Sequence, residues 1–397
     1  MSTAKVSSKR RICYLSGTRA DFGLMVSTLR LIDRHPGLDL AVLVTGMHLA
    51  EAYGHTAREI EAEGFRIAAR VSCDLGPATG AQMARNIGTM LIGFVDALEA
   101  EQPDLLLVLG DRGEMLAGTL AAAHLGIPVA HVHGGERSGT VDEPVRHAIS
   151  KLAHLHFVAT EDARDRLVRM GEHGRHIHVT GAPGLDGLAA LAQVGREALC
   201  QSEGLNPTER LALFVFHPVL HEAVLAGQQA RAALEVLLDE GYQVLALQPN
   251  SDAGNAPVRA ALEELHREGR LVLKTHLPRP TFVSWMAAVN VFVGNSSSGI
   301  IEAATFGTPV INLGSRQNMR ERNANVLDIS IDAQALRSAL QQVRAHTPRH
   351  ANAVPSALHP NSECVNVYGD GHAGPRIAKL LAELPLPSEL LAKCNAY

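Results

Sequence analysis

The sequence predicts an α/β protein with two Rossmann-like, doubly wound domains that face each other across a cleft. Short apolar runs alternate with amphipathic stretches, which is typical of a parallel sheet with helices on both faces. The alternation stops after Gly181-Ala182-Pro183 and then begins again. The length of 397 residues exceeds what one hydrophobic core usually supports, so two domains are expected.

Residues 1–188 are predicted to form the N-terminal domain. Strands are expected at Ile12–Leu15, Leu40–Val44, Leu105–Leu109 and Val129–Val132. Helices are expected at Leu24–Asp33, Thr56–Glu63, Met83–Glu101 and Glu114–Leu125. The run DLLLVLGDR is apolar on both faces of a strand, as an interior parallel strand should be.

Residues 189–397 are predicted to form the C-terminal domain, after a connecting helix and loop at Leu188–Gly204. Strands are expected at Leu211–Phe216, Gln243–Gln248, Leu271–Lys274, Val291–Gly294 and Val310–Leu313. Helices are expected at Ala223–Asp239, Ala256–Arg267, Pro280–Ala288 and Gly299–Phe306. A last helix, within about 372–397, is expected to cross back to the first domain. Ligands of such sheets bind outside the carboxyl ends of the strands, so polar residues that follow strands are candidate site residues.

The composition excludes several classes of protein. Hydrophobic residues make up 46% and charged residues 19%, as in ordinary globular proteins. The formal net charge is −5 and no basic patch stands out, so nucleic acid is not an expected partner. Neither a secretory h-region nor a membrane-spanning apolar run is found. Five scattered cysteines suggest neither a disulfide framework nor a metal site, which favours a cytoplasmic location: Cys13, Cys73, Cys200, Cys364 and Cys394.

The stretch VFVGNSSSGIIEAATFGTPVINLGSRQ is the richest in chemistry in the second half. Small polar residues, including Ser296 and Ser297, close a strand just before a helix, and backbone N–H groups at a helix start suit a pyrophosphate. Glu302 can accept hydrogen bonds from ribose hydroxyls, and Arg316 lies in a second polar loop. An ordinary N-cap before a surface helix is the simpler alternative. His217 and Asn250 each follow a strand of the same sheet, which favours the binding site.

In the first half, Arg19 lies in the first strand–helix loop. Asp111 follows a wholly apolar strand, and the neighbouring Arg112 is placed to keep it ionised or to contact phosphate. The next strand leads into AHVHGGERSGTVDEPVRHAI, which carries His133, Glu136 and further charged groups. Carboxylates near one cleft are what proton transfer at carbon requires. A metal held by His131 and His133 is the rival interpretation, but no third ligand has the right spacing, so no metal or other cofactor is predicted.

Taken as a set, the motifs resemble the hydrolysing UDP-N-acetylglucosamine 2-epimerases of sialic and related nonulosonic acid biosynthesis. The motifs lie in the same order between about Arg11 and Val326: SGTRADFG, TGMH, GDR, HVHGGERSGTVDE, RHAISKLAH, FHPV, GNSSSG and FGTPVINLGSRQ. The resemblance implies the two-domain glycosyltransferase-B architecture, with UDP held mainly by the second domain. It also suggests a homodimer or homotetramer and a UDP-sugar substrate.

Site residues follow from the resemblance by position. Asp111 and Asp142 match acidic residues that the family uses in catalysis, and His217 matches its histidine near the diphosphate. The matching UDP-binding positions are Arg19, Asn250, His276, Ser296, Ser297, Glu302 and Arg316. Arg112 and Arg146 complete the predicted substrate-binding residues. Many members read H-x-E-G-G-E with a catalytic first glutamate, whereas this chain has His133 there; either His133 or Glu136 takes that role, and we favour Glu136 on sequence.

The resemblance therefore implies release of UDP by elimination to a glycal, followed by water addition that yields the free 2-epimer, N-acetylmannosamine. UDP-N,N′-diacetylbacillosamine, the precursor of legionaminic-type acids, is the alternative substrate. More distant alternatives are a non-hydrolysing epimerase, a glycosyltransferase of the same fold and a nucleotide-sugar-binding regulator. The GGERSGT stretch favours the hydrolysing branch over the first, and the carboxylates after Asp111 argue against the others.

Overall fold

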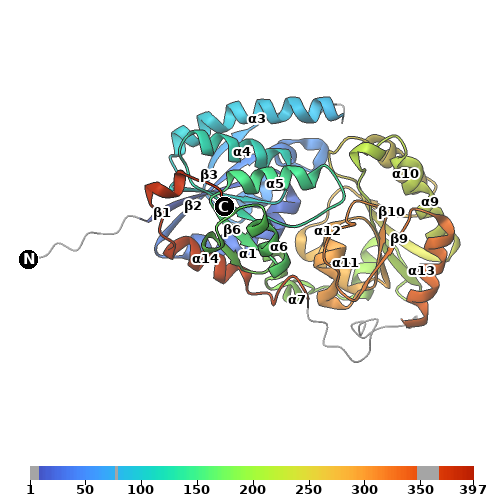
Figure 1. Cartoon of the computed structure of the whole chain (residues 1–397). Coiled ribbons are helices and arrows are strands. Elements are labelled where there is room, and N and C mark those ends of the chain that lie inside the picture. The colour runs from blue at the N-terminus through green and yellow to red at the C-terminus, as the bar shows by residue number, and fades with distance from the viewer. Residues whose placement is uncertain (1–8, 77–78, 347–365) are drawn as a thin grey trace, which may run out of the picture.

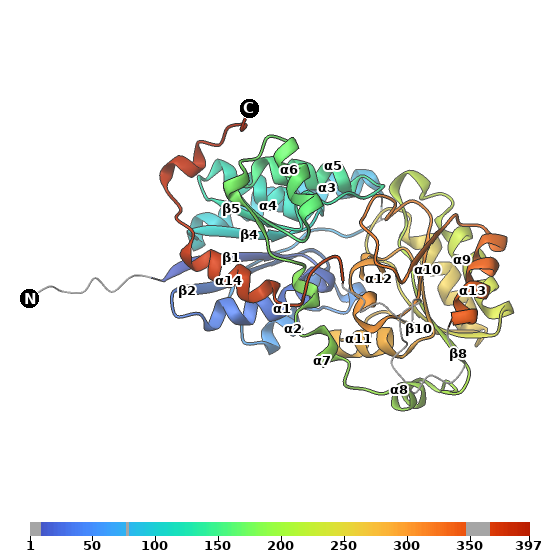
Figure 2. The ribbon, with the colours of Figure 1, turned by 60° about the horizontal axis from the view of Figure 1, so that its bottom comes forward.

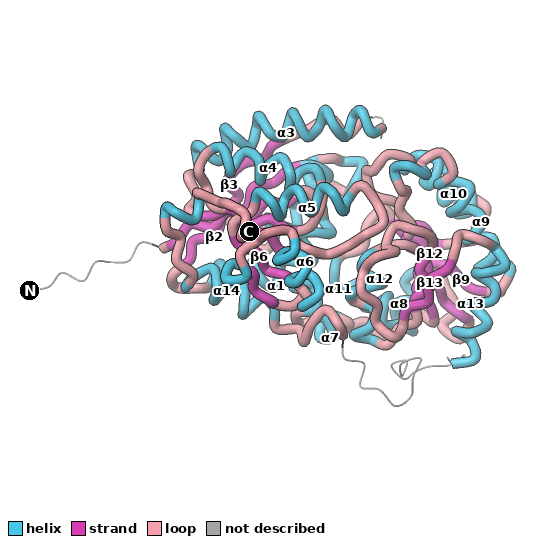
Figure 3. Tube along the Cα trace, viewed as in Figure 1, coloured by secondary structure: helices cyan, strands magenta, loops and turns pink. Residues whose placement is uncertain are grey.

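The computed structural model describes residues 9–76, 79–346 and 366–397. Within these residues the chain forms two α/β domains, each built on one parallel sheet with helices packed around it (Figure 1; Figure 3). The fold class predicted from the sequence is confirmed.

The described part of the first domain contains a seven-stranded sheet in the order β3-β2-β1-β4-β5-β6-β7, and all neighbouring pairs are parallel. The strands are β1 (Arg10–Ser16), β2 (Leu38–Thr45), β3 (Ile67–Val71), β4 (Leu105–Leu109), β5 (Val129–Val132), β6 (Leu155–Val158) and β7 (Ile177–Val179). The helices are α1 (Arg19–Arg34), α2 (Ala57–Ala62), α3 (Gly80–Glu101), α4 (Gly113–His124), α5 (Asp142–Leu152) and α6 (Glu161–Arg169).

The described part of the second domain contains a six-stranded parallel sheet in the order β10-β9-β8-β11-β12-β13. Its strands are β8 (Arg210–Val215), β9 (Tyr242–Leu247), β10 (Val272–Lys274), β11 (Val291–Gly294), β12 (Val310–Leu313) and β13 (Val326–Ile329). The helices after residue 187 are α7 (Leu188–Leu191), α8 (Arg196–Glu203), α9 (Ala226–Asp239), α10 (Asn255–Arg267), α11 (Arg279–Ala288), α12 (Ser297–Ile301), α13 (Ala333–His346) and α14 (Ala373–Glu383).

Alternation along β1 explains how one strand serves two cores. Ile12 and Tyr14 face the layer that holds α1, whereas Cys13 and Leu15 face the layer that holds α3 and α4. All four side chains are buried. Burying one large aliphatic side chain contributes ~1.5–3 kcal/mol, so the central strands anchor the loops that follow them.

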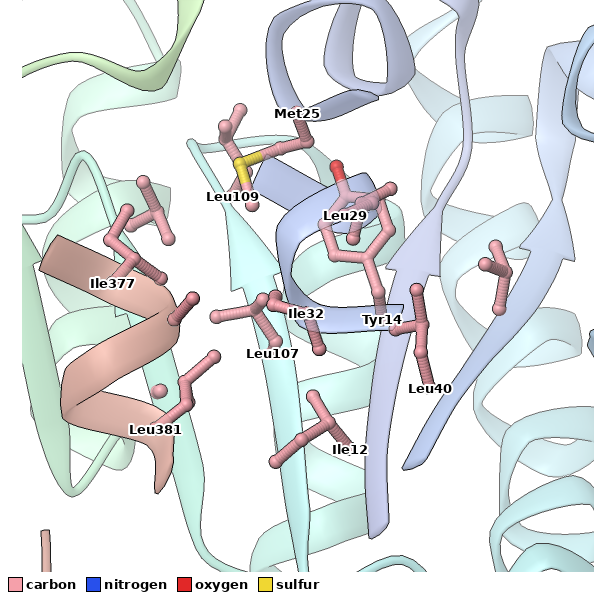
Figure 4. Close-up of a cluster of buried hydrophobic side chains, with 14 of the residues drawn as sticks. Ile12, Tyr14, Met25, Leu29, Ile32, Leu40, Leu107, Leu109, Ile377 and Leu381 are labelled. Atoms are coloured by element: carbon pink, nitrogen blue, oxygen red, sulfur yellow. The ribbon is translucent and has the colours of Figure 1, made fainter. Parts of the chain in front are cut away.

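Helix α14 packs against the first domain, although it follows the second domain in the sequence. Ile377 and Leu381 belong to the same buried cluster as Met25, Leu29 and Ile32 of α1 (Figure 4). A second view shows α14 beside α1, away from the second sheet (Figure 2). Asp186 fixes the start of α14, because its carboxylate accepts hydrogen bonds from the N–H groups of Ala373 (2.9 Å) and Gly374 (2.5 Å).

The strand orders place one switch point in each sheet, where the chain turns from one direction of winding to the other. In the first sheet it lies between β1 and β4, and in the second between β8 and β11. The crevice outside the carboxyl ends of such strands is the usual ligand site of a doubly wound sheet. The loops that follow these four strands therefore define where a site is expected.

Two observations concern the chain as a whole. None of the helices in the described ranges has the length and apolar character that crossing a membrane requires. Cys13, Cys73, Cys200 and Cys394 are free thiols, and Cys364 lies outside the described residues.

Candidate active site

One cavity between the two domains collects side chains from the carboxyl ends of both sheets. The loops after β1, β4 and β5 border it on one side, and those after β8, β9, β11 and β12 on the other. All residues that the sequence predicts for the site line it: Arg19, Asp111, Arg112, His133, Glu136, Asp142, Arg146, His217, Asn250, His276, Ser296, Ser297, Glu302 and Arg316. The structure thus brings them together, and their individual roles stay predictions.

The polar turn after β11 depends on close packing of two strands. Gly294 has a φ of 145°, and a Cβ added there would clash with the carbonyl of Val215 on β8. Ser296 then caps α12, and its hydroxyl accepts a hydrogen bond from the N–H of Ser298 (3.4 Å). The unpaired N–H groups of the first helical turn are available to an anion in the cavity.

The helix after this turn differs from the prediction of one helix over Gly299–Phe306. Helix α12 begins earlier, at Ser297, and ends at Ile301, and a 3-10 turn follows at Ala303–Phe306. Gly307, with φ of 62°, closes that turn. Because the chain must reverse before Pro309, the last turn tightens instead of continuing as an α-helix.

Asn295 connects three parts of the second domain. Its side-chain oxygen accepts the N–H of His217 (2.7 Å), and its side-chain nitrogen donates to the His217 carbonyl (2.8 Å). The Asn295 carbonyl accepts hydrogen bonds from Arg316 (3.2 Å) and Gln317 (3.1 Å). Asn295 therefore holds both Arg316 and His217 next to the polar turn at residues 295–298, the serine turn.

The role of His217 is restricted by a backbone amide. The Asn250 N–H donates to Nδ1 of His217 (3.2 Å), so Nδ1 must be the unprotonated nitrogen. Burial and then the positive charge of Arg316 lower the pKa of His217 to about 3. A neutral His217 therefore carries its proton on Nε2 and acts as a hydrogen-bond donor.

Glu302 is a buried carboxylate with one strong partner. Its side chain is 3% exposed and pairs with the guanidinium of Arg279 at 2.6 Å. Burial raises the pKa of Glu302, whereas Arg279 opposes that rise. Arg279 also donates to the Gly184 carbonyl of the first domain (3.1 Å), so this pair lies where the two domains meet.

Asp111 lies on a well-anchored turn. Gly110 before it has a φ of 84°, and its carbonyl contacts Nε2 of His131 at 2.7 Å. The Asp111 carboxylate pairs with Arg146, whose side chain is 1% exposed. Arg146 also donates to the Glu136 carbonyl (2.9 Å). Both of these contacts of Arg146 are therefore to other residues of the first domain. A direct contact of Arg146 with substrate stays a prediction.

Arg112 has different partners from those that the sequence suggested. Its guanidinium lies 2.9 Å from Glu114 and 3.3 Å from Asp252 of the second domain. Asp252 in turn accepts a hydrogen bond from the side chain of Asn250 (2.6 Å). The expectation that Arg112 holds Asp111 ionised is therefore corrected, because adjacent residues at a strand end point in different directions and Arg146 fills that position.

His133 and Glu136 lie on the two sides of the Gly134-Gly135 bend and contact each other through Nδ1 and Oε1. His133 has a φ of 62°, a left-handed conformation that is unusual for a residue with a side chain. Glu136 also pairs with Arg320 of the second domain. Asp142 begins α5 and lies 3.8 Å from Arg316.

Two further predicted residues connect the domains. Arg19 donates to the Thr275 carbonyl at 2.6 Å, and His276 contacts Glu59. Both pairs join a helix of the first domain, α1 or α2, to the loop after β10, so the cavity is closed on this side by polar contacts.

A metal does not follow from the histidines of the HVH segment. His131 is fully buried and is engaged by Ser150 and the Gly110 carbonyl. Among the described residues, no group of three or more His, Cys, Asp or Glu side chains is placed to hold a metal ion. Metal independence stays a prediction, which exhaustive chelation would test.

Sequence reasoning missed Arg279, Arg320 and Asp252. Each pairs with a residue far away in the chain: Glu302, Glu136 and Arg112, respectively. Arg320 could have been suspected from its place in SRQNMRER, the polar loop after β12 that also holds Arg316. Its partner in the other domain could not.

Comparison with known proteins places the chain. A family model described as UDP-N-acetylglucosamine 2-epimerase matches residues 30–382. The UDP-N,N′-diacetylbacillosamine 2-epimerase (hydrolyzing) of Legionella pneumophila is 45% identical over 391 residues, which is 98% of this chain and 100% of that protein. The UDP-N-acetylglucosamine 2-epimerase of Neisseria meningitidis is 36% identical over 336 residues, 84% of this chain and 87% of that protein.

Solved structures agree on the fold. The Neisseria meningitidis UDP-GlcNAc 2-epimerase bound to UDP-GlcNAc has a TM-score of 0.77 at 19% identity, over 94% of this chain and 99% of that chain. The complex of the Methanocaldococcus jannaschii UDP-GlcNAc 2-epimerase with UDP-GlcNAc and UDP has a TM-score of 0.76 at 18% identity, over 94% and 99%.

Proposed function

This chain belongs to the UDP-N-acetylglucosamine 2-epimerase family and is a hydrolysing UDP-sugar 2-epimerase, and from that premise we propose that its substrate is UDP-N,N′-diacetylbacillosamine. The observation that carries the proposal is the 45% identity to the Legionella pneumophila enzyme of that name, which extends over all of that protein. UDP-N-acetylglucosamine, the first choice from sequence motifs, is the second candidate, supported by the 36% identical Neisseria meningitidis enzyme.

The geometry of the cavity supports this chemistry. UDP lies along the second domain, with its diphosphate between the serine turn, Arg316 and the Nε2–H of His217. These donors are fixed before substrate arrives, so they stabilise the charge that develops on the leaving diphosphate without a cost of reorganisation. Glu302 is placed for the ribose hydroxyls, and the sugar faces the carboxylates of the first domain.

The reaction follows from the acidity of C2. Its proton is not next to a carbonyl, so it becomes acidic only as the C1–O bond to UDP breaks and C1 turns cationic. Asp111 and Asp142 stabilise that charge. The C2–H electron pair then forms the C1=C2 bond of a glycal, and UDP leaves with the electrons of the C1–O bond. Water oxygen adds to C1, a proton adds to C2 from the opposite face, and the free epimer is released.

A small panel of nucleotide sugars tests the substrate. The purified protein is given UDP-N,N′-diacetylbacillosamine, its GDP counterpart and UDP-N-acetylglucosamine, and nucleoside diphosphate release is measured. We expect kcat/KM for the first to exceed that for the others by at least ~10-fold, because substituents that fill a shaped pocket discriminate by that much or more. An equal or higher kcat/KM for UDP-N-acetylglucosamine would select the second candidate instead.

A further inference from the structure

Three carboxylates that the first domain directs into the cavity are each matched by an arginine. The pairs are Asp111 with Arg146, Asp142 with Arg316, and Glu136 with Arg320. A carboxylate next to a guanidinium is stabilised in its ionised form and is a weaker base for it. These carboxylates can therefore stabilise positive charge in the cavity. Their arginine partners make them weak bases for the C2 proton.

Glu136 is the most strongly held of these carboxylates. Oε1 contacts Nδ1 of His133, and Oε2 pairs with Nη1 of Arg320. Its side chain is 4% exposed. Burial alone raises the pKa of Glu136, but Arg320 and His133 outweigh it and lower the pKa to about 2. With both oxygens engaged and its charge balanced, Glu136 is poorly suited to take a proton from carbon.

The contact with Glu136 fixes the tautomer of His133. An ionised carboxylate can only accept, so Nδ1 of the imidazole must be the protonated nitrogen. Nε2 of a neutral His133 therefore keeps its lone pair. It makes no hydrogen bond to any residue in the described ranges, and His133 lines the cavity.

The backbone holds His133 in this position against its own preference. It follows β5, its N–H donates to the Phe157 carbonyl (3.1 Å), and its φ is 62°. Gly135, two residues later, has a φ of 74°, and a Cβ there would clash with the Ala163 carbonyl. Unfavourable conformations of this kind persist only where the surroundings impose them, and they gather at functional sites.

We propose, on the basis of the proposed function, that Nε2 of His133 is the base that removes the C2 proton and that Glu136 and Arg320 are its positioning residues. The C2–H bond breaks, its proton goes to Nε2, and the electron pair forms the C1=C2 bond as UDP leaves. The buried carboxylate stabilises the imidazolium that forms and fixes its orientation, as carboxylates do for catalytic histidines. The imidazolium then returns its proton to solvent.

Arg320 connects the His133–Glu136 pair to the part of the second domain that is proposed to bind UDP. It lies in the loop after β12 that also carries Arg316, which is hydrogen-bonded to the serine turn. His133 and Glu136 therefore have all their partners only when Arg320, in this loop of the second domain, contacts Glu136 at the Gly134-Gly135 bend of the first domain. Binding of UDP to the second domain and assembly of the base are coupled through one short segment.

The decisive variant is His133→Asn. Asparagine tolerates the left-handed backbone and places an N–H near the position of Nδ1, so the contact with Glu136 is kept while Nε2 is lost. We expect turnover to fall by at least ~100-fold, the usual contribution of a general base, with UDP affinity within about twofold of wild type, since the UDP contacts are left intact. His133→Gly, which also fits this φ, should regain turnover when imidazole is added.

His147→Asn is the matched control. His147 forms the comparable pair with Glu143 (3.7 Å) one helical turn away, outside the lining of the cavity. We expect its turnover to match that of wild type. If His133→Asn keeps turnover within tenfold of wild type while Glu136→Gln abolishes it, Glu136 is the base and the proposal is overturned.

Nitrogen-15 NMR of labelled histidine tests the arrangement without turnover. His133, identified by its loss in His133→Asn, should show a protonated Nδ1 and an unprotonated Nε2. In Glu136→Gln, the amide oxygen must face Arg320, so its NH₂ faces Nδ1 and the tautomer should reverse. A wild-type His133 protonated at Nε2 would overturn the proposal. If wild type releases no nucleoside diphosphate from any sugar of the panel, the proposed function fails, and this spectrum still decides the state of His133.

Discussion

Two histidines in the cavity, His133 and His217, carry their proton on different ring nitrogens, because each has a different hydrogen-bond partner at Nδ1. The Asn250 N–H occupies Nδ1 of His217, so Nε2 of His217 carries the proton. The Glu136 carboxylate accepts from Nδ1 of His133, so Nε2 of His133 carries the lone pair. One imidazole can only donate towards substrate, and the other can accept a proton from it.

Substitutions at the two ends of the cavity should separate binding from turnover. Asp111→Asn removes a charge that faces the sugar, so we expect turnover to fall by ~10²–10⁴-fold. Ser297→Ala and Glu302→Ala remove the contacts that we propose for UDP and should weaken its binding by roughly tenfold, the effect of one hydrogen bond to a charged group. Steady-state kinetics and calorimetric UDP binding measure both, and an Asp111→Asn enzyme with near-normal turnover would remove Asp111 from the chemistry.

At this scale the sequence predicts position better than role. Residues after strands, such as Asp111 and His217, reach the cavity because parallel strands deliver their carboxyl ends to one edge. Partners were less predictable. The pairing of Glu136 with Arg320 joins residues 184 positions apart, and no local pattern indicates it. The preference for Glu136 as base rested on carboxylate chemistry alone and changes once its two partners are known.

At the scale of elements, the bend after β5 is the feature that the site depends on most. Gly135→Ala would place a Cβ against the Ala163 carbonyl at a φ of 74°, so we expect a loss of at least about 2 kcal/mol in the free energy of unfolding. Gly88→Ala is the control, because Gly88 is exposed within α3 and nothing lies near its added Cβ. It should stabilise by ~0.5–1 kcal/mol. Urea unfolding of both variants measures the difference, and an unchanged Gly135→Ala would show that the bend is adaptable.

Most of the strands that sequence analysis found are interior ones, with the edge strand β10 as the exception. Those it did not find are the edge strands β3, β7 and β13 and the short interior strand β6. β1, β4, β8 and β11 are continuous apolar runs that stand out in the sequence. β3 forms one edge of the first sheet and β13 forms one edge of the second. The side chains of both strands are largely half-exposed. Their apolar signal is therefore weak. The start of α1 at Arg19, five residues before the predicted Leu24, follows from the Thr18–Asp21 capping box.

At the scale of the whole molecule, buried histidines should make stability depend on pH. Burial is the largest cause that lowers the pKa values of His131 and His217 to about 3 and those of His48 and His154 to about 4. In the unfolded chain these imidazoles gain protons below about pH 6.5. Their contribution to stability is therefore complete above that pH and is lost as the pH falls towards 4 and then 3.

Four carboxylates act in the opposite direction, because burial raises the pKa values of Asp21, Asp186, Glu302 and Glu321. Burial raises the pKa of Asp21 to about 6, so the folded protein binds that proton first and gains stability as the pH falls through this range. The histidines outnumber these carboxylates, because burial also lowers the pKa values of His147, His156, His176 and His178. We therefore expect Tm to fall between pH 7 and pH 4.5. Calorimetry in two buffers of different ionisation enthalpy should show net proton uptake on unfolding near pH 5.5. A Tm that rises over this interval would contradict the expectation.

The two domains contribute different groups to the cavity. In the proposed reaction, the second domain supplies fixed donors for the diphosphate, and the first supplies carboxylates and a histidine for the sugar. The pairs Arg320–Glu136, Arg316–Asp142 and Arg112–Asp252 join the two domains across the cavity. Residues of both domains line the cavity, so neither domain alone contains the complete proposed site.

Deuterium incorporation at C2 tests the proposed reaction most directly. In D₂O the proton removed from C2 is replaced from solvent on the opposite face. The free sugar should therefore carry one deuterium at C2, with inverted configuration, and one UDP should be released for each sugar. Proton NMR and mass spectrometry of the purified product measure both. A free sugar without deuterium at C2, or an epimer still attached to UDP, would contradict the elimination and hydration pathway.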